Sequence, residues 1–167
     1  YEEWKQKFVD IDDESDIIKA DVTISSRSSG KGNANAILHF DVDLNNRQQK
    51  LLDSLPEFDS KVVVKKSDVK LSDLSALTAK TGDEFAMFTK QGKRLIVRGN
   101  NTMVNITAEK AAELAQAGYH WSGHTHPGTD VLCLIPSDGD KKILAAFGQS
   151  TSVIYNSKGD NSTFGEE

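Results

Sequence analysis

The stretch "TAEKAAELAQAGYHWSGHTHPG", residues 107–128, decides the expected fold because it joins a helical pattern directly to an extended one. Thr107 can cap a helix in which Ala111 and Leu114 carry the apolar stripe. Gly118 stands at the C-cap position, where a glycine commonly ends a helix. The residues after it predict a strand that runs into a loop. A helix followed at once by a strand predicts a sheet with helices packed against it.

The segments on either side of this stretch alternate between the same two patterns, and they extend the prediction to the whole chain. Further helices are expected over residues 1–10, 45–58 (ending near Pro56), 72–82 (capped by Ser72) and 137–149. Further strands are expected over residues 20–26, 36–44, 61–66 and 150–157, together with a hairpin over 83–101 that turns at Gly92. The segments 27–35 and 158–167 have no periodicity and predict a loop and a polar tail. The fold class is therefore α/β (α+β), with a mixed β-sheet flanked by helices.

The length of 167 residues predicts one compact domain with a short N-terminal appendage. Residues 1–30 are expected to form a helix and a linker, which includes the acidic run "DIDDESD". Residues 31–167 are expected to form the main domain. Because the chain starts at Tyr1 rather than at a methionine, we expect it to be a fragment that follows an upstream domain.

Composition excludes several classes of partner. The formal net charge is −5, and no run of Lys and Arg is long enough to bind nucleic acid. No apolar stretch is long enough to span a bilayer, and no secretion signal opens the chain. The single Cys133 excludes an internal disulfide and a cysteine-rich zinc site, and its apolar neighbours predict burial rather than nucleophilic chemistry.

Two histidines at the end of the predicted strand are the strongest functional signal. Residues i and i+2 of a strand point to the same face, so His124 and His126 can aim both imidazoles at one point. Such a pair suits a zinc ion. His120 is expected on the same face, as an additional contact or an ordinary surface residue, whereas Trp121 is expected on the opposite face and in the core.

A catalytic zinc usually takes three protein ligands and keeps a fourth position for water. The third ligand is expected among Asp130, Asp138 and Asp140, which follow the histidines. Ser137 and Asp140 also have a structural explanation, because Ser-x-x-Asp resembles a capping box at the start of a helix. Glu84, a charge at the start of an apolar strand, is the candidate base for a metal-bound water, and its alternative role is a solvent-facing edge residue.

These residues, in this order, resemble the JAMM (MPN-type) zinc peptidase family. Glu84, the sequence His124-Thr-His126-Pro, and Ser137-x-x-Asp140 match the family's pattern, and the element order from about residue 60 to 156 fits as well. The resemblance implies a JAMM/cytidine-deaminase-like sandwich. It also implies that His124, His126 and Asp140 bind Zn²⁺, that Glu84 holds and deprotonates the zinc water, and that Ser137 stabilises the oxyanion.

One departure from the family concerns the loop between the second histidine and the aspartate. Thirteen residues separate His126 from Asp140, which makes this loop longer than is usual in the family. Loops tolerate such insertions at small energetic cost. Asp140 is therefore the expected third ligand, and Asp138 is the fallback.

The resemblance implies a zinc-dependent hydrolase that cleaves a peptide or isopeptide bond in a protein substrate, such as one joined to a ubiquitin-like modifier. The first ten residues also resemble the segment that follows head-morphogenesis domains in phage minor head proteins. That similarity implies the alternative of a non-catalytic structural or interaction module of a phage particle with a degenerate metal site. A cytoplasmic or virion-associated location is expected in either case. A zinc deaminase is a third hypothesis, but the chain lacks the expected Cys-x-x-Cys ligands.

Overall fold

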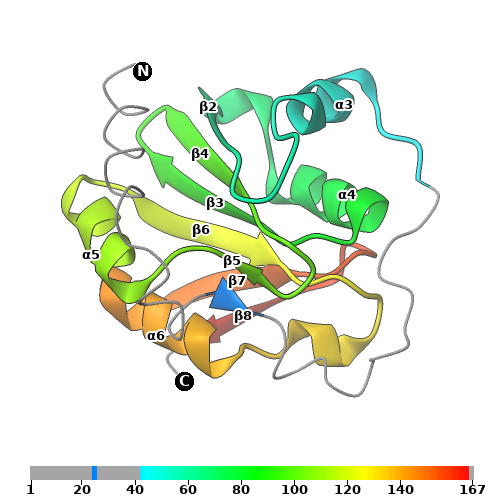
Figure 1. Cartoon of the computed structure of the whole chain (residues 1–167). Coiled ribbons are helices and arrows are strands. Elements are labelled where there is room, and N and C mark those ends of the chain that lie inside the picture. The colour runs from blue at the N-terminus through cyan, green and yellow to red at the C-terminus, as the bar shows by residue number, and fades with distance from the viewer. Residues whose placement is uncertain (1–23, 26–41, 166–167) are drawn as a thin grey trace.

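The computed structural model describes residues 24–25 and 42–165 of the chain. They form a mixed sheet flanked by helices on both faces, which confirms the predicted fold class (Figure 1). The α-helices are α3 (Asn46–Asp53), α4 (Leu71–Thr81), α5 (Ala108–Gln116) and α6 (Asp138–Phe147). The strands are β1 (Ile24–Ser25), β2 (Lys61–Lys65), β3 (Phe85–Lys90), β4 (Lys93–Arg98), β5 (Met103–Val104), β6 (His120–Thr125), β7 (Thr151–Tyr155) and β8 (Asn161–Gly165). Two short 3₁₀ helices are η3 (Lys66–Asp68) and η4 (Val131–Leu134).

The main sheet has six strands in the order β2-β4-β3-β6-β7-β8, and β6 therefore lies in its interior. β6 and β7 run parallel, and every other neighbouring pair in this sheet is antiparallel. The short strands β1 and β5 form a separate two-stranded sheet. A strand with a neighbour on each side and helices above and below is shielded from water, so the polar side chains at the C-terminal end of β6, His124 and Thr125, are buried with it.

Strand alternation on β3 divides the interior into two layers. Phe85 and Met87 belong to a cluster that α3 and α4 complete on one face of the sheet. Ala86 and Phe88 belong to the larger cluster on the opposite face, which α5 and α6 complete. Because successive side chains of a strand point to opposite faces, a run of apolar residues can contribute to both clusters. We refer to these two surfaces as the α4 face and the α6 face.

The turns and helix ends follow local backbone chemistry. The predicted hairpin is confirmed: β3 and β4 are joined by a two-residue turn in which Gln91 has a φ of 54°, followed by Gly92. Gly82 ends α4 with a φ of 80°, as expected of a glycine in the left-handed region. The predicted Ser72 cap is wrong, because α4 begins one residue earlier and the backbone N–H of Lys70 donates to Asp73 instead.

Among the described residues, no helix has the length and apolarity needed to cross a membrane.

Two other predictions about strands are wrong at the sheet edges. Residues 61–66 read as a buried strand, but β2 is an edge strand in which Val63 is the buried residue. The predicted polar tail contains β8, which forms the other edge and buries Phe164. Both edges carry polar residues, which protect an unpaired strand from association with other chains.

Several predictions fall on residues that the structure does not describe. The N-terminal helix over 1–10, the loop over 27–35 and the domain boundary after residue 30 all lie outside the described residues. The predicted strand over 20–26 is represented by Ile24–Ser25, which pairs with β5. Most of the predicted strand over 36–44 is also outside the described part, and its last three residues are not in a strand.

Candidate metal centre

The end of β6 is held on both sides by the neighbouring strands. His124 lies opposite Ala86 of β3 and Ile154 of β7, and Thr125 lies opposite Tyr155. The backbone N–H of His126 donates to the Tyr155 carbonyl over 2.9 Å, which extends the pairing past the end of the strand. These pairings fix the backbone of both histidines without any contribution from a bound ligand.

Thr125, between the two histidines, fixes the strand from the α4 face. Its Oγ1 accepts the backbone N–H of Phe85 over 2.9 Å and lies 2.5 Å from the hydroxyl of Thr78 on α4. All three residues are fully buried. Because Thr125 points to the α4 face, its neighbours on either side, His124 and His126, both point to the α6 face, as the sequence predicts.

A β-bulge changes the orientation of the earlier residues of β6. The register with β3 shifts between Met87, which pairs with Gly123, and Phe88, which pairs with Trp121, so Ser122 is the extra residue. The bulge places Trp121 on the α6 face beneath His124. The prediction that Trp121 faces away from the histidines is therefore wrong, although its burial in the core is confirmed. His120 lies on the α4 face, so the prediction that it shares a face with His124 is also wrong.

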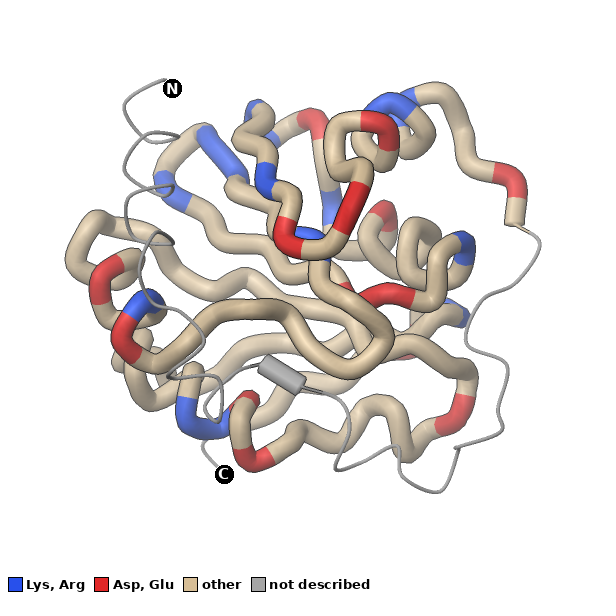
Figure 2. The backbone as a smooth tube through the Cα atoms, viewed as in Figure 1, with Lys and Arg blue, Asp and Glu red and all other residues tan. Residues whose placement is uncertain are grey.

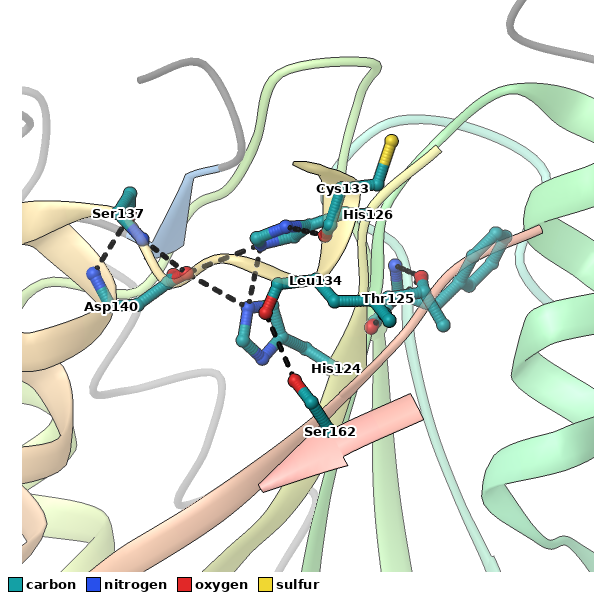
Figure 3. Close-up of polar contacts among 9 residues, drawn as sticks. His124, Thr125, His126, Cys133, Leu134, Ser137, Asp140 and Ser162 are labelled. Carbon is teal, nitrogen blue, oxygen red and sulfur yellow. Dashed lines mark hydrogen bonds and ion pairs between the residues drawn. The ribbon is translucent and has the colours of Figure 1, made fainter. Parts of the chain in front are cut away.

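Three ligand atoms converge on the α6 face, as Figure 3 shows. The Nε2 atoms of His124 and His126 are 3.0 Å apart, and Asp140 Oδ2 is 3.2 Å from each of them. A tetrahedral zinc site with Zn–N distances of about 2.0–2.1 Å separates neighbouring ligand atoms by about 3.3 Å. The observed triangle is close to that size, and two imidazoles with one carboxylate are a typical donor set for zinc. The three residues therefore fit a zinc ion.

The ring of His126 is oriented by the loop that follows it. Its Nδ1 lies 2.6 Å from the backbone carbonyl of Cys133 in η4. A carbonyl can only accept, so Nδ1 carries the proton and the lone pair of Nε2 faces Asp140 and His124. A hydrogen bond from the outer nitrogen of a ligand histidine is the usual device that fixes its tautomer for metal binding.

The ring of His124 is held by aromatic packing instead. It stacks on Trp121 with ring centroids 4.8 Å apart, and Phe164 lies edge-on at 6.0 Å. Its Nδ1 is buried and makes no hydrogen bond among the described residues. Burial in this apolar setting lowers the pKa of His124, which favours the neutral form that a metal requires.

Asp140 reaches the histidines from the first turn of α6. The predicted capping box is confirmed: Ser137 Oγ accepts the Asp140 N–H, and Asp140 Oδ2 accepts the Ser137 N–H, each over 3.0 Å. Burial alone would raise the pKa of the Asp140 carboxyl, but the charges and hydrogen bonds of His124 and His126 hold it well below its usual range. For His126, burial is outweighed by Asp140 and the charge of Glu84, and the pKa is raised.

The loop after the histidines brings Asp140, and not the other two candidate aspartates, to them. Asp130 caps η4 by accepting the Leu132 N–H over 2.9 Å. Asp138 is exposed at the first residue of α6. The loop contains η4, which leaves Val131 and Leu132 exposed and places the Cys133 carbonyl next to His126. The loop thus adds a contact to the ligand cluster.

Glu84 is buried next to this cluster. Its backbone N–H and carbonyl pair with residues 100 and 99 ahead of β3, and its side chain has no exposure to solvent. Since Ala86 lies opposite His124, the same antiparallel register continued by two residues places Glu84 opposite His126 on the α6 face. The alternative of a solvent-facing edge residue is therefore wrong. Ser137, the other candidate catalytic residue, is also buried, at the cap of α6.

Comparisons with family models, with curated proteins and with solved structures found no match to this chain.

Replacing Thr125 with valine should destabilise the end of β6 while preserving its shape. The change leaves the buried Phe85 N–H without its acceptor, and an unsatisfied buried donor costs about 1–3 kcal/mol. Urea denaturation should show a loss of that size in the free energy of unfolding. The control is Thr163→Val on the exposed side of β8, which should change little. An equal loss in both variants would contradict the role given to the Thr125 hydroxyl.

Proposed function

We propose that this chain is a zinc-dependent hydrolase that cleaves a peptide or isopeptide bond with a metal-activated water. The observation that carries the proposal is the triangle of His124 Nε2, His126 Nε2 and Asp140 Oδ2. Three protein ligands leave a fourth position in a tetrahedral site, which is the arrangement of catalytic rather than structural zinc. The likeness of the sequence pattern to JAMM peptidases supplies the bond type.

The residues around the triangle have distinct tasks in this proposal. His124, His126 and Asp140 would hold the zinc ion, whose contribution is to lower the pKa of water and polarise a carbonyl. Glu84 takes the proton from the attacking water and delivers it to the leaving amine. Its position on the same face as the histidines, and its effect on the pKa of His126, support that assignment.

The hydroxyl of Ser137 can still donate one hydrogen bond after it has capped α6. Its Oγ accepts the Asp140 N–H, which leaves its hydroxyl proton available to donate. In the proposed reaction this proton stabilises the oxyanion of the tetrahedral intermediate. The capping box holds Ser137 beside a ligand, so the donor is oriented before substrate arrives.

A second candidate is a non-catalytic module in which the metal only stabilises the fold. The observation that favours it is burial, because His124, His126 and Asp140 have no exposure to solvent. Structural zinc sites are closed, whereas a hydrolase must admit a substrate. The two candidates agree on the metal and differ on the role of Glu84, so they can be separated by experiment.

Metal content distinguishes the proposed ligands from their neighbours. Purified wild-type protein should hold close to one zinc per chain, measured by inductively coupled plasma mass spectrometry and by competition with a chromogenic chelator. Losing an outer hydrogen-bond partner of a ligand costs about 10- to 100-fold in affinity, so Asp140→Ala should cost at least that. The matched control, Asp138→Ala, removes an exposed carboxylate two residues away and should leave the affinity unchanged. If Asp138→Ala bound zinc more weakly than Asp140→Ala, Asp138 and not Asp140 would be the third ligand.

Activity then separates the enzyme from the structural module. Wild-type protein and Glu84→Gln should be assayed against a panel of peptide and isopeptide substrates, including conjugates of ubiquitin-like proteins. Loss of a general base costs about 100-fold or more, so the variant should retain zinc and lose hydrolysis. A zinc-loaded wild type that cleaves nothing in the panel would favour the structural module. Cleavage at the wild-type rate by Glu84→Gln would exclude Glu84 as the base.

A further inference from the structure

A second polar site lies at the opposite end of β6 from the metal ligands. A cavity of about 330 Å³ opens on the α4 face beside His120, the first residue of the strand. Four residues of strand, about 13 Å, separate His120 from His124. The cavity is therefore distinct from the metal centre, and the inference below does not depend on the proposed function.

Three basic residues from different segments line this cavity. Lys66 follows β2, Arg94 lies on β4 and His120 begins β6. Among the described residues, no Asp or Glu lines it. Figure 2 shows Lys and Arg gathered over β2, β3 and β4 at the upper left, although the chain as a whole carries a net charge of −5. A basic cluster without a carboxylate concentrates positive potential where an anion can reach it.

The positive charges are not neutralised by the part of the chain that the structure describes. Arg94 Nη1 donates to the Val69 carbonyl over 2.9 Å and contacts Met87 Sδ, while its buried Nε has no acceptor among the described residues. The guanidinium is thus fixed in place without a counter-charge. Burial and the charges of Lys66 and Arg94 lower the pKa of His120, which favours its neutral form, so the positive charges at the cavity are those of Lys66 and Arg94.

Hydroxyl groups complete the lining of the cavity. Thr89 Oγ1 and Ser122 Oγ lie 2.5 Å apart, and Thr151 at the start of β7 also lines the cavity. The hydroxyl of Ser152, another lining residue, donates to the Trp121 carbonyl over 3.0 Å. Ser122 is the bulge residue of β6, so the bulge that turns Trp121 toward the metal ligands also delivers this hydroxyl to the α4 face.

The helix arrangement leaves this end of the sheet accessible. α4 begins at Leu71, whose side chain packs so closely on Gly123 that a Cβ at that glycine would lie 2.9 Å from Leu71 Cδ2. His120 and Ser122, which precede this contact on β6, lie beside the cavity instead.

We propose that this cavity binds a phosphate or phosphoryl group. A tetrahedral oxyanion offers acceptors to the Lys66 ammonium, the Arg94 guanidinium and the surrounding hydroxyls at once. Charge-assisted hydrogen bonds of this kind are about twice as strong as neutral ones. The cavity is also at the small end of the range for ligand pockets, which suits a small anion or the end group of a larger molecule.

The test is a titration of the protein with inorganic phosphate, followed by calorimetry and by backbone amide shifts in ¹H–¹⁵N spectra. Saturable binding should shift the amides of residues around His120 and Ser122. Lys66→Gln and Arg94→Gln should each weaken binding about tenfold, the effect of losing one charge-assisted hydrogen bond. The side chain of Lys66 is exposed, so Lys66→Gln should fold. The test therefore stays valid if Arg94→Gln does not fold.

The matched control is Lys158→Gln, which removes one positive charge from the exposed β7–β8 turn and should leave phosphate affinity unchanged. A parallel titration with O-phosphoserine distinguishes a free ion from a phosphorylated ligand, since tighter binding of the ester indicates the latter. Absence of saturable binding, shifts confined to other residues, or an equal loss in Lys158→Gln and Lys66→Gln would overturn the proposal.

Discussion

The close approach of two imidazole nitrogens and a carboxylate oxygen is the constraint on which the site depends. In the neutral ring of His126 the Cys133 carbonyl fixes the proton on Nδ1, so Nε2 presents a lone pair. Asp140 Oδ2, 3.2 Å away, presents another. A proton on His124 Nε2 can satisfy only one of these acceptors well, whereas a cation can satisfy all three. Without a metal, a second proton on His126, favoured by the raised pKa of that ring, has to satisfy Asp140. A cation can replace that proton and bind all three atoms at once, which is the physical reason to infer a metal.

The fold provides this geometry through backbone pairing rather than through the ligands themselves. β6 is fixed between β3 and β7, Thr125 secures it to α4, and the capping box orients Asp140. The strand pairing and the Thr125 contact involve atoms away from the ligand position, whereas the capping box also holds the ligand atom Asp140 Oδ2 through the Ser137 N–H. Ligand groups held by independent contacts are preorganised, so binding a metal would require little rearrangement.

Much of the site could be predicted from the sequence because it follows from short-range rules. The spacing of His124 and His126 sets their common face, and Ser137-x-x-Asp140 sets the start of α6. The bulge at Ser122 could not be predicted, because an inserted residue in a strand needs no particular side chain and reveals itself only in the register with β3. For the same reason, the sequence placed Trp121 and His120 on the wrong faces.

The strands at the edges of the sheet also could not be predicted from local sequence patterns. β8 is polar at most positions, and it forms a strand because β7 offers an unpaired edge next to it, which is a tertiary effect. The burial of Glu84 likewise follows from its position just before the interior strand β3 and opposite His126, whereas its sequence neighbourhood alone allowed a solvent-facing edge.

The most direct test of a zinc ion at this triangle is anomalous diffraction at the zinc absorption edge from crystals of the protein grown with zinc. We expect one strong peak within about 2.0–2.2 Å of His124 Nε2, His126 Nε2 and a carboxylate oxygen of Asp140. Absence of a peak at saturating zinc, or a peak coordinated by other residues, would contradict it.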